Sequence, residues 1–384
     1  MRRLLILPLA ALLALGGCSK DKDAEQPAKL VVLAHPLPVR ELWHVKVGGG
    51  KHQMLLRLGL GPAVADGVAF AASDKGIVEA VDVASGRRLW RRPLRLPLSA
   101  GPGVGEGLVV LGSSKGDLVA LDAKSGRERW RVRTDAELLS TPAIGQGLVV
   151  ARSVDGRLRA FDATTGAQRW SVEQPVPKLS LRGIATPVIA KDAVVSGFDN
   201  GKIMAVNLVN GNTLWETTLE APHGRTELER LVDVDCAVVV DGDNVYAAGY
   251  HGRTAQLALG SGQIWWAHDM SSDHGLAVAG DVVYVAEADG TLIALHAADG
   301  SEIWHNSTLK WRGLSAPVVT PSAVVVGDYQ GYLHWFDRKD GKIIARARDS
   351  KFRISSAPIA VGDRIVVLSD GGELAAFRAA APAG

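Results

Sequence analysis

The sequence has very few cysteines, and its histidines follow no metal-binding pattern. It contains 2 cysteines in 384 residues. Cys18 lies at the end of an apolar N-terminal segment, which leaves Cys236 as the one thiol in the rest of the chain. A single thiol cannot form an internal disulfide framework. The 10 histidines include no His-x-x-x-His or His-Glu-x-x-His pair, so the sequence gives no support for a zinc hydrolase.

Net charge is also nearly absent. Lys and Arg number 43, against 41 Asp and Glu. Two of the basic residues, Arg2 and Arg3, belong to an N-terminal segment that we expect to be removed, after which basic and acidic residues balance. A chain without net charge has no general attraction for nucleic acid or for acidic lipid headgroups. We therefore expect no nucleic-acid partner, and any other partner must be recognised by local patches.

The N-terminal apolar run is too short to cross a membrane as a helix. It covers residues 4–15, whereas a spanning helix needs about 20 residues. With two arginines before it and small residues after it, the run is typical of a signal peptide, predicted at 1–17. Leu15-Gly-Gly-Cys18 resembles the lipobox of bacterial lipoproteins, which implies a lipid on Cys18. Ser rather than Asp at residue 19 then implies sorting to the outer membrane. The alternative is a secreted protein with a chance cysteine at its cleavage site.

The next segment has the composition of a linker. Residues 18–29 are charged, include Pro27 and show no apolar periodicity, so we predict a flexible tether. The remaining residues, 30–384, are predicted to form a single domain.

Aromatic residues make up only 5% of the chain, yet they include 10 Trp against 5 Tyr and 6 Phe. A repeat explains this bias. Its clearest copies, Gly116–Trp130 and Gly156–Trp170, share the frame Gly-x-Leu-x-Ala-(Leu/Phe)-Asp-x-x-(Ser/Thr)-Gly-x-x-x-Trp. The apolar residues before the Asp predict a strand, the Gly after Ser or Thr predicts a tight turn, and the Trp falls in a second strand.

The spacing of the repeat predicts the architecture. Copies of Gly-x-x-x-Trp end at Trp90, Trp130, Trp170, Trp215, Trp266 and Trp304. A seventh copy has Ala345 in the Trp position, and Trp43 precedes the first full unit. Strand-turn-strand units that recur about every 40 residues are typical of a β-propeller with one blade per period. We interpret the tryptophans as packing between blades; the alternative is a ligand cage.

Each unit also contains an apolar run without alternation, such as Leu108–Leu111 and Leu148–Ala151. Such runs predict inner strands that are buried on both faces. There are eight of them. The last unit, near 357–377, lacks a fourth strand, and 42–47 is a strand without a blade, so their pairing would close the ring and hide both edges. We predict an all-β fold, an eight-bladed β-propeller closed by its N-terminal and C-terminal strands.

Two motifs that suggest catalysis stand in the wrong context. Gly112-Ser-Ser-Lys-Gly116 matches Gly-x-Ser-x-Gly, but it falls between two predicted strands rather than at a strand-to-helix turn. The glycine-rich stretch 101–107 resembles a phosphate loop but opens no helix, so we predict that it is a turn.

Two enlarged connections are the candidate binding site. Residues 174–183 and 223–235 both occupy the slot that joins the outer strand of one blade to the inner strand of the next. Equivalent connections of consecutive blades emerge side by side on one face, and apolar residues beside charges on such loops are typical of a partner site. The alternative is an internal Arg–Asp pair that only braces two blades. The residues that we expect to gather there are Leu179, Leu181, Arg182, Asp233 and Asp235.

The repeat resembles that of pyrroloquinoline-quinone (PQQ) dehydrogenases and of the BamB family of lipoproteins. The segments 178–183 and 230–235 are the most specific part of the resemblance to BamB. There, the two leucines, the arginine and the two aspartates contact BamA, and they correspond to the five residues above. The resemblance implies a non-catalytic scaffold without a cofactor, anchored in the outer membrane and facing the periplasm. It would bind the POTRA domains of BamA, join the other subunits of the barrel assembly (BAM) complex and help deliver unfolded β-barrel precursors.

Two other functions stay open at this point. A PQQ-dependent quinoprotein dehydrogenase shares the repeat, but the resemblance leads one to expect adjacent cysteines and a calcium site, and the chain has no adjacent cysteines. The second is a propeller that binds peptides or sugars in its central channel.

Overall fold

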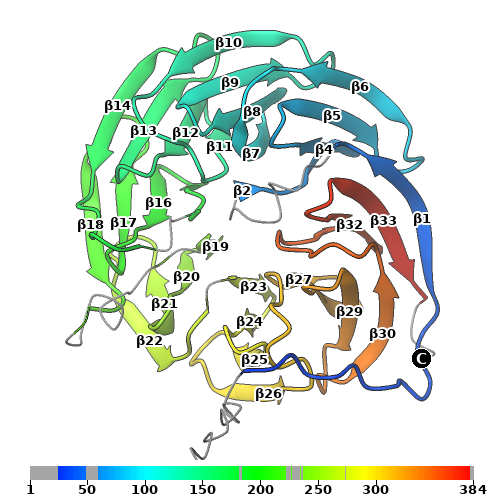
Figure 1. Ribbon diagram of the computed structural model, residues 1–384. Helices are drawn as coiled ribbons and strands as arrows, with labels where there is room; N and C mark the ends of the chain where they lie inside the picture. Colours follow the sequence, from blue (N-terminus) through cyan, green and yellow to red (C-terminus); the bar gives the residue numbers. More distant parts are fainter. Residues whose placement is uncertain are drawn as a thin grey trace, which may run out of the picture.

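The eight predicted blades are present. The computed structural model describes residues 25–48, 59–180, 184–221, 226, 234, 237–272 and 274–380. These residues form eight sheets arranged in a ring (Figure 1). The described part of the chain is all-β, and it contains no helix long and apolar enough to cross a membrane. The predicted fold class and blade count are therefore confirmed.

Seven blades follow the chain order, with the first strand near the axis and the last at the rim (Figure 1). Blades 1 to 4 comprise β3 (Ala63–Ala65), β4 (Val68–Ala72), β5 (Ile77–Asp82), β6 (Arg88–Pro93); β7 (Leu98–Gly105), β8 (Leu108–Ser113), β9 (Asp117–Asp122), β10 (Glu128–Arg133); β11 (Ala143–Gly145), β12 (Leu148–Arg152), β13 (Arg157–Asp162), β14 (Gln168–Glu173); and β15 (Val188–Ala190), β16 (Ala193–Gly197), β17 (Lys202–Asn207), β18 (Thr213–Thr218). Blades 5 to 7 comprise β19 (Val239–Asp241), β20 (Asn244–Ala248), β21 (Arg253–Ala258), β22 (Ile264–Asp269); β23 (Leu276–Ala279), β24 (Val282–Ala286), β25 (Leu292–His296), β26 (Glu302–Asn306); and β27 (Val318–Val319), β28 (Ala323–Gly327), β29 (Tyr332–Asp337), β30 (Ile343–Arg348).

Blade 8 closes the ring from both ends of the chain. It comprises β31 (Ile359–Val361), β32 (Arg364–Leu368), β33 (Glu373–Ala379) and, at the rim, β1 (Val39–Lys46). β1 pairs antiparallel with β33, and Trp43 lies opposite Ala376. The predicted pairing of the first and last strands is confirmed, and it gives this blade four strands like its neighbours.

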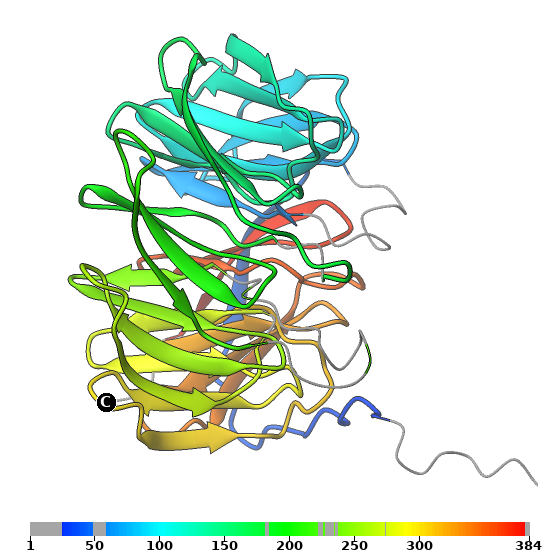
Figure 2. The same ribbon diagram turned by 90° about the vertical axis from the view of Figure 1, so that its left-hand side faces the viewer.

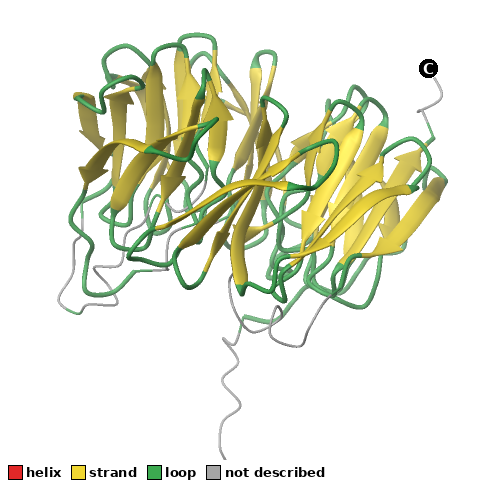
Figure 3. Ribbon diagram, turned by 90° about the horizontal axis from the view of Figure 1, so that it is seen from above, coloured by secondary structure: helices red, strands yellow, loops and turns green. Residues whose placement is uncertain are grey.

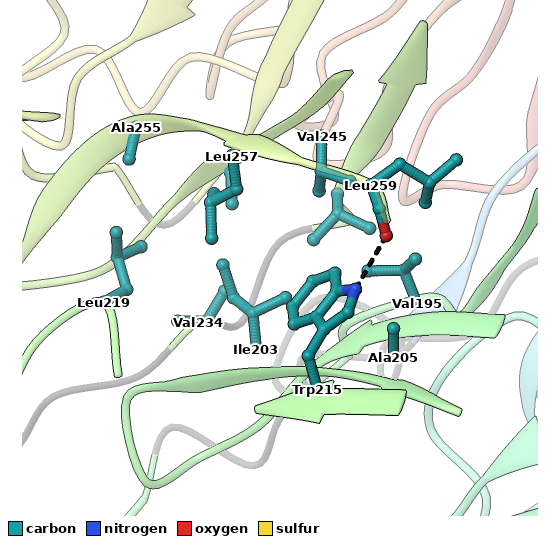
Figure 4. Packing of buried hydrophobic residues seen from close by; sticks show 12 residues of the cluster. Val195, Ile203, Ala205, Trp215, Leu219, Val234, Val245, Ala255, Leu257 and Leu259 are labelled. Carbon is teal, nitrogen blue, oxygen red and sulfur yellow. Dashed lines mark hydrogen bonds between the residues drawn. The ribbon is translucent and has the colours of Figure 1, made fainter. Parts of the chain in front are cut away.

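The repeat tryptophans pack between blades, as predicted. Each indole Nε1–H donates a hydrogen bond to a main-chain carbonyl of the next blade; Trp215, for example, donates to Leu259 at 2.7 Å (Figure 4). The same bond is made by Trp43, Trp90, Trp130, Trp170, Trp266 and Trp304. Each ring lies against the turn glycine of that blade. A Cβ on Gly262, whose φ is +68°, would lie 2.4 Å from Cε3 of Trp215.

Ala345 stands where the repeat has its Trp, and the closing blade provides the reason. Each tryptophan covers a turn between the third and fourth strands of the next blade. In blade 8 no turn joins β33 to β1, because these strands come from opposite ends of the chain. Leu37 and Val39 instead pack into the cluster that contains the buried Ala345. The absence of a Trp at position 345 therefore leaves the packing between blades 7 and 8 intact.

The hydrophobic core is divided into clusters that lie between neighbouring blades. The cluster in Figure 4 joins Ile203 and Trp215 of blade 4 to Val245 and Leu257 of blade 5. The apolar runs of the second strands are buried after their half-buried first residue, as in β8 and β12. This confirms the prediction that the non-alternating runs are covered on both faces.

The two motifs that resembled catalytic loops are strand and turn. Ser113 is buried, and its hydroxyl donates to Asp117 Oδ2 at 2.9 Å within the β8–β9 hairpin. The prediction that 101–107 is a turn is wrong for most of its length, because β7 continues to Gly105. The glycines serve close packing instead: a Cβ on Gly103 would lie 2.0 Å from the carbonyl oxygen of Pro142 in the next connection.

The same region contains a strand that the sequence pattern did not predict. β2 (Gly59–Leu60) pairs in parallel with β7, so blade 2 has five strands. β2 belongs to a third enlarged connection, residues 47–62, which joins β1 to β3.

Connections from a rim strand to the next inner strand lie on one face of the disk, which Figures 2 and 3 show from its edge. They meet the turns between the second and third strands there. Thr134 N–H donates to the Gly116 carbonyl at 2.7 Å, and Leu219 N–H donates to Gly201 at 2.9 Å. We call this side the connection face.

Candidate protein-binding site

Two connections on the connection face form the candidate site, and both adjoin blade 4. The first runs from β14 to β15 and the second from β18 to β19. Their described parts are residues 174–180, 184–187, 219–221, 226, 234, 237 and 238. Both connections are attached to the turn between β16 and β17, residues 198–201, which we call the floor.

The first connection starts at the β12–β13 turn of blade 3 and reaches the floor through the side chain of Gln174. Gln174 is buried, and its main-chain N–H donates to the Gly156 carbonyl at 3.0 Å. Its side-chain oxygen accepts a hydrogen bond from Asn200 Nδ2 at 3.3 Å, and its Nε2 donates to Glu216 Oε2 at 2.7 Å. Hydrogen bonding from Lys202 is the main influence that lowers the pKa of Glu216. Glu216 is therefore an ionised acceptor at neutral pH.

The second connection meets the same floor at two points. Leu219 and Glu220 both donate their main-chain N–H to the Gly201 carbonyl, at 2.9 and 3.2 Å. Further along, Val234 donates its N–H to the Phe198 carbonyl at 3.2 Å and is only 1% exposed. Val234 packs in the cluster between blades 4 and 5. One four-residue turn therefore contacts both connections, the first through the Gln174 side chain and the second through three main-chain hydrogen bonds.

A buried ion pair fixes the floor to blade 3. Arg152 of β12 pairs with Asp199, and both side chains are almost fully buried. The guanidinium carbon of Arg152 also lies 5.2 Å from the ring centroid of Phe198. Removal of one partner from such a pair costs about 3–5 kcal/mol, because it leaves a buried charge without compensation. The floor is accordingly a rigid support for the two connections.

The structure describes one of the five predicted contact residues and leaves out the other four. Leu179 is described, and the residue is 44% exposed. Leu181, Arg182, Asp233 and Asp235 lie outside the described residues, as do the predicted lipid site Cys18 and the second cysteine, Cys236. The proximity of these side chains therefore stays a prediction, whereas the common attachment of their connections is observed.

Sequence analysis missed two features of the connection face. Val176, in the first connection, is a second exposed apolar residue of that loop. The third enlarged connection starts on the same face, where Val47 N–H donates to the Gly372 carbonyl of the β32–β33 turn at 3.0 Å. The step of 47 residues from Trp43 to Trp90 was a signal that this connection exists. Among the described residues, no group of three or more His, Cys, Asp or Glu is placed to hold a metal ion.

Comparison with known proteins identifies the family of the chain. The family described as "Outer membrane protein assembly factor BamB" matches residues 74–306. An outer membrane protein assembly factor BamB from Pseudomonas aeruginosa is 45% identical over 370 residues, which cover 96% of this chain and 97% of that protein. The chain belongs to the BamB family. The Escherichia coli BamB is 33% identical over 391 residues, covering 97% of this chain and 98% of that protein.

Solved structures place the fold in the same family. The crystal structure of BamB from Moraxella catarrhalis matches with a TM-score of 0.81 and 26% identity, over 89% of this chain and all of that chain. A europium-containing methanol dehydrogenase matches with a TM-score of 0.72 but only 14% identity, over 88% of this chain and 93% of that chain. The second likeness shows the propeller fold alone. The chain is thus an eight-bladed β-propeller of the BamB family of outer membrane protein assembly factors.

Proposed function

We propose that this chain is a non-catalytic scaffold that binds the POTRA domains of BamA through the two connections attached to the floor. In this proposal it is a subunit of the BAM complex and assists the folding and insertion of β-barrel precursors. A lipid on Cys18 anchors it in the outer membrane, with the propeller in the periplasm.

One observation carries the proposal: two connections that contain the family's contact pattern are attached to a single rigid turn. Leu179 presents an apolar side chain at this place, and an exposed apolar residue on a rigidly supported loop suits a protein partner. The scaffold role also agrees with the names of the full-length relatives. In this proposal the propeller positions other proteins and catalyses no reaction.

Capture of a soluble BamA POTRA fragment tests the proposal. Arg182→Ala and Asp233→Ala should each weaken capture, because each removes a charged contact predicted for the partner. Arg129→Ala is the matched control, since Arg129 is an exposed rim residue of blade 2 that pairs with Asp122. Thermal melting followed by tryptophan fluorescence verifies the fold of each variant. Unchanged capture by the double variant contradicts the site, and loss of the fold in either single variant favours the bracing role.

A further inference from the structure

The segment that precedes the first rim strand is bound along the outside of blades 6 and 7 (Figure 1). At its start, Ala28 N–H donates to the Lys310 carbonyl at 2.9 Å. At its end, Leu37 N–H donates to the Ile344 carbonyl of β30 at 2.8 Å. Between them, the Leu30 side chain packs against the cluster between the two blades. Residues 28–37 are thus held at both ends and in the middle; we call them the clasp.

Two arginines bind the main chain of the clasp. Arg312 donates from Nη1 to the Ala28 carbonyl at 2.9 Å. Arg346 donates from Nη1 to the Val31 carbonyl at 2.9 Å. A guanidinium group presents several N–H donors in a fixed geometry, so it suits the recognition of carbonyl oxygens in an extended segment.

These arginines are positioned by a buried network that does not depend on the clasp. Arg312 is 2% exposed and donates from Nε and Nη2 to Asp328 Oδ2, at 2.9 and 2.7 Å. His334 Nε2 lies 3.0 Å from the same oxygen, and Arg346 Nε donates to His334 Nδ1 at 3.2 Å. Because Nδ1 accepts, His334 is neutral and carries its proton on Nε2, and burial lowers its pKa in the same direction. Arg312 and Arg346 are therefore held in position to bind the clasp.

The clasp begins on the connection face. Lys310 and Arg312 belong to the connection from β26 to β27, which occupies the same slot as the two connections of the candidate site. Trp311 N–H donates to the Asp289 carbonyl at 2.7 Å, the contact that equivalent connections make with their neighbouring turns.

We propose that the clasp fixes the point where the lipid tether leaves the propeller, so that the partner-binding connections face the membrane that holds the anchor. This inference rests on the proposed lipidation of Cys18 and on the proposed partner site. With the clasp bound, only Ser19–Ala28 separates the anchor from the propeller, ten residues that reach at most about 33–36 Å. With the clasp released, Ser19–Pro38 doubles this length. The effective concentration of the propeller at a membrane-bound partner then falls roughly threefold, following the −3/2 power of tether length.

The clasp is tested first on the soluble chain without a lipid. The clasp contains one trypsin site, the bond after Lys29. The rate of its cleavage is compared with that in a free peptide of residues 19–38. The test variant is Ala28→Pro with Arg346→Met, which removes the hydrogen bonds to Lys310 and Val31. The control is Arg348→Met, because Arg348 also lies on β30 but donates to the carbonyls of Gln330 and Ser350.

Wild type and control should be cleaved at least about tenfold more slowly than the peptide, and the double variant nearly as fast as the peptide. Ala28→Pro alone should move in the same direction, which guards against a loss of fold caused by the change at Arg346. Equal rates for wild type and peptide, or slow cleavage of a folded double variant, would overturn the clasp.

The consequence for the anchor is tested with lipidated chain and BamA in phosphatidylethanolamine–phosphatidylglycerol vesicles. The double variant should capture BamA about threefold less well on vesicles, yet capture the soluble POTRA fragment as well as wild type does. Equal capture on vesicles overturns the inference alone. Loss of soluble capture by every variant, wild type included, instead overturns the proposed function.

Discussion

Replacement of Gly197 by Ala tests whether the floor controls the candidate site. Gly197 ends β16, directly before the floor. A Cβ there would lie 2.5 Å from the carbonyl oxygen and 2.6 Å from Cγ1 of Val234. Its backbone is not in the left-handed region, so the cost arises from space alone. Because contacts below 3.0 Å force a shift, the added methyl must displace Val234 and the second connection.

Overpacking of a well-packed site costs about 1–3 kcal/mol, so we expect a melting temperature lowered by a few degrees. Displacement of the second connection should also weaken capture of the POTRA fragment at least about tenfold, which is about 1.4 kcal/mol. Equilibrium capture at several fragment concentrations gives this number, and the melting curve gives the stability.

Gly327→Ala is the matched control for this experiment. Gly327 holds the equivalent position in blade 7, and a Cβ there would lie 2.4 Å from Cγ2 of Ile354. This variant should lose similar stability, because the crowding is equally severe, while its capture stays at the wild-type level. The reasoning is refuted if the two variants capture equally well, or if Gly197→Ala melts at a lower temperature but captures normally.

Three further predictions concern the fold and its chemistry. Burial is the main cause that raises the pKa of Asp349 to about 7, well above its ordinary 3.8. The stability from its bound proton is present below about pH 4 and lost as pH rises through 7. Asp349→Asn should therefore flatten the dependence of the melting temperature on pH between about pH 4 and 7, and an unchanged slope there would contradict this. Trp215→Phe leaves the Leu259 carbonyl without its donor and should cost about 1–3 kcal/mol in urea unfolding; an unchanged midpoint would argue against a structural indole. Addition of PQQ and Ca²⁺ should produce neither a bound chromophore nor dye reduction with alcohols, and either signal would revive the quinoprotein reading.

The repeating part of the fold could be predicted from the sequence because one structural unit recurs from blade to blade. Each period carries its own strand signal, its turn glycine and its Trp, so errors at one copy are corrected by the others. The closure also followed from counting, since a last unit without a rim strand requires the strand at Trp43. Ala345 looked like a defect in the sequence. Its reason depends on the closing blade having no turn for a Trp to cover.

Other features leave no periodic signal. The clasp is held largely through main-chain atoms of Ala28, Val31 and Leu37, so its side chains do not mark it. Its first contact, at Ala28, lies inside the segment 18–29 that was predicted as a flexible tether. The pairing of β2 with β7 involves only two residues of a connection. At the candidate site, the slot of the connections was predictable, but their attachment to one turn became visible only through Gln174 and Val234.

A photo-crosslinking residue at position 179 gives the most direct test of the central claim, that the two connections form one partner-binding surface. Leu179 is exposed and lies in the first connection, while Val209, 77% exposed in the β17–β18 turn of the same blade, is the control position. Irradiation of intact cells followed by mass spectrometry should identify an adduct between position 179 and a BamA POTRA domain, and none from position 209. An adduct with BamA from position 209 alone, or none from position 179 in a folded, membrane-associated chain, would contradict the account.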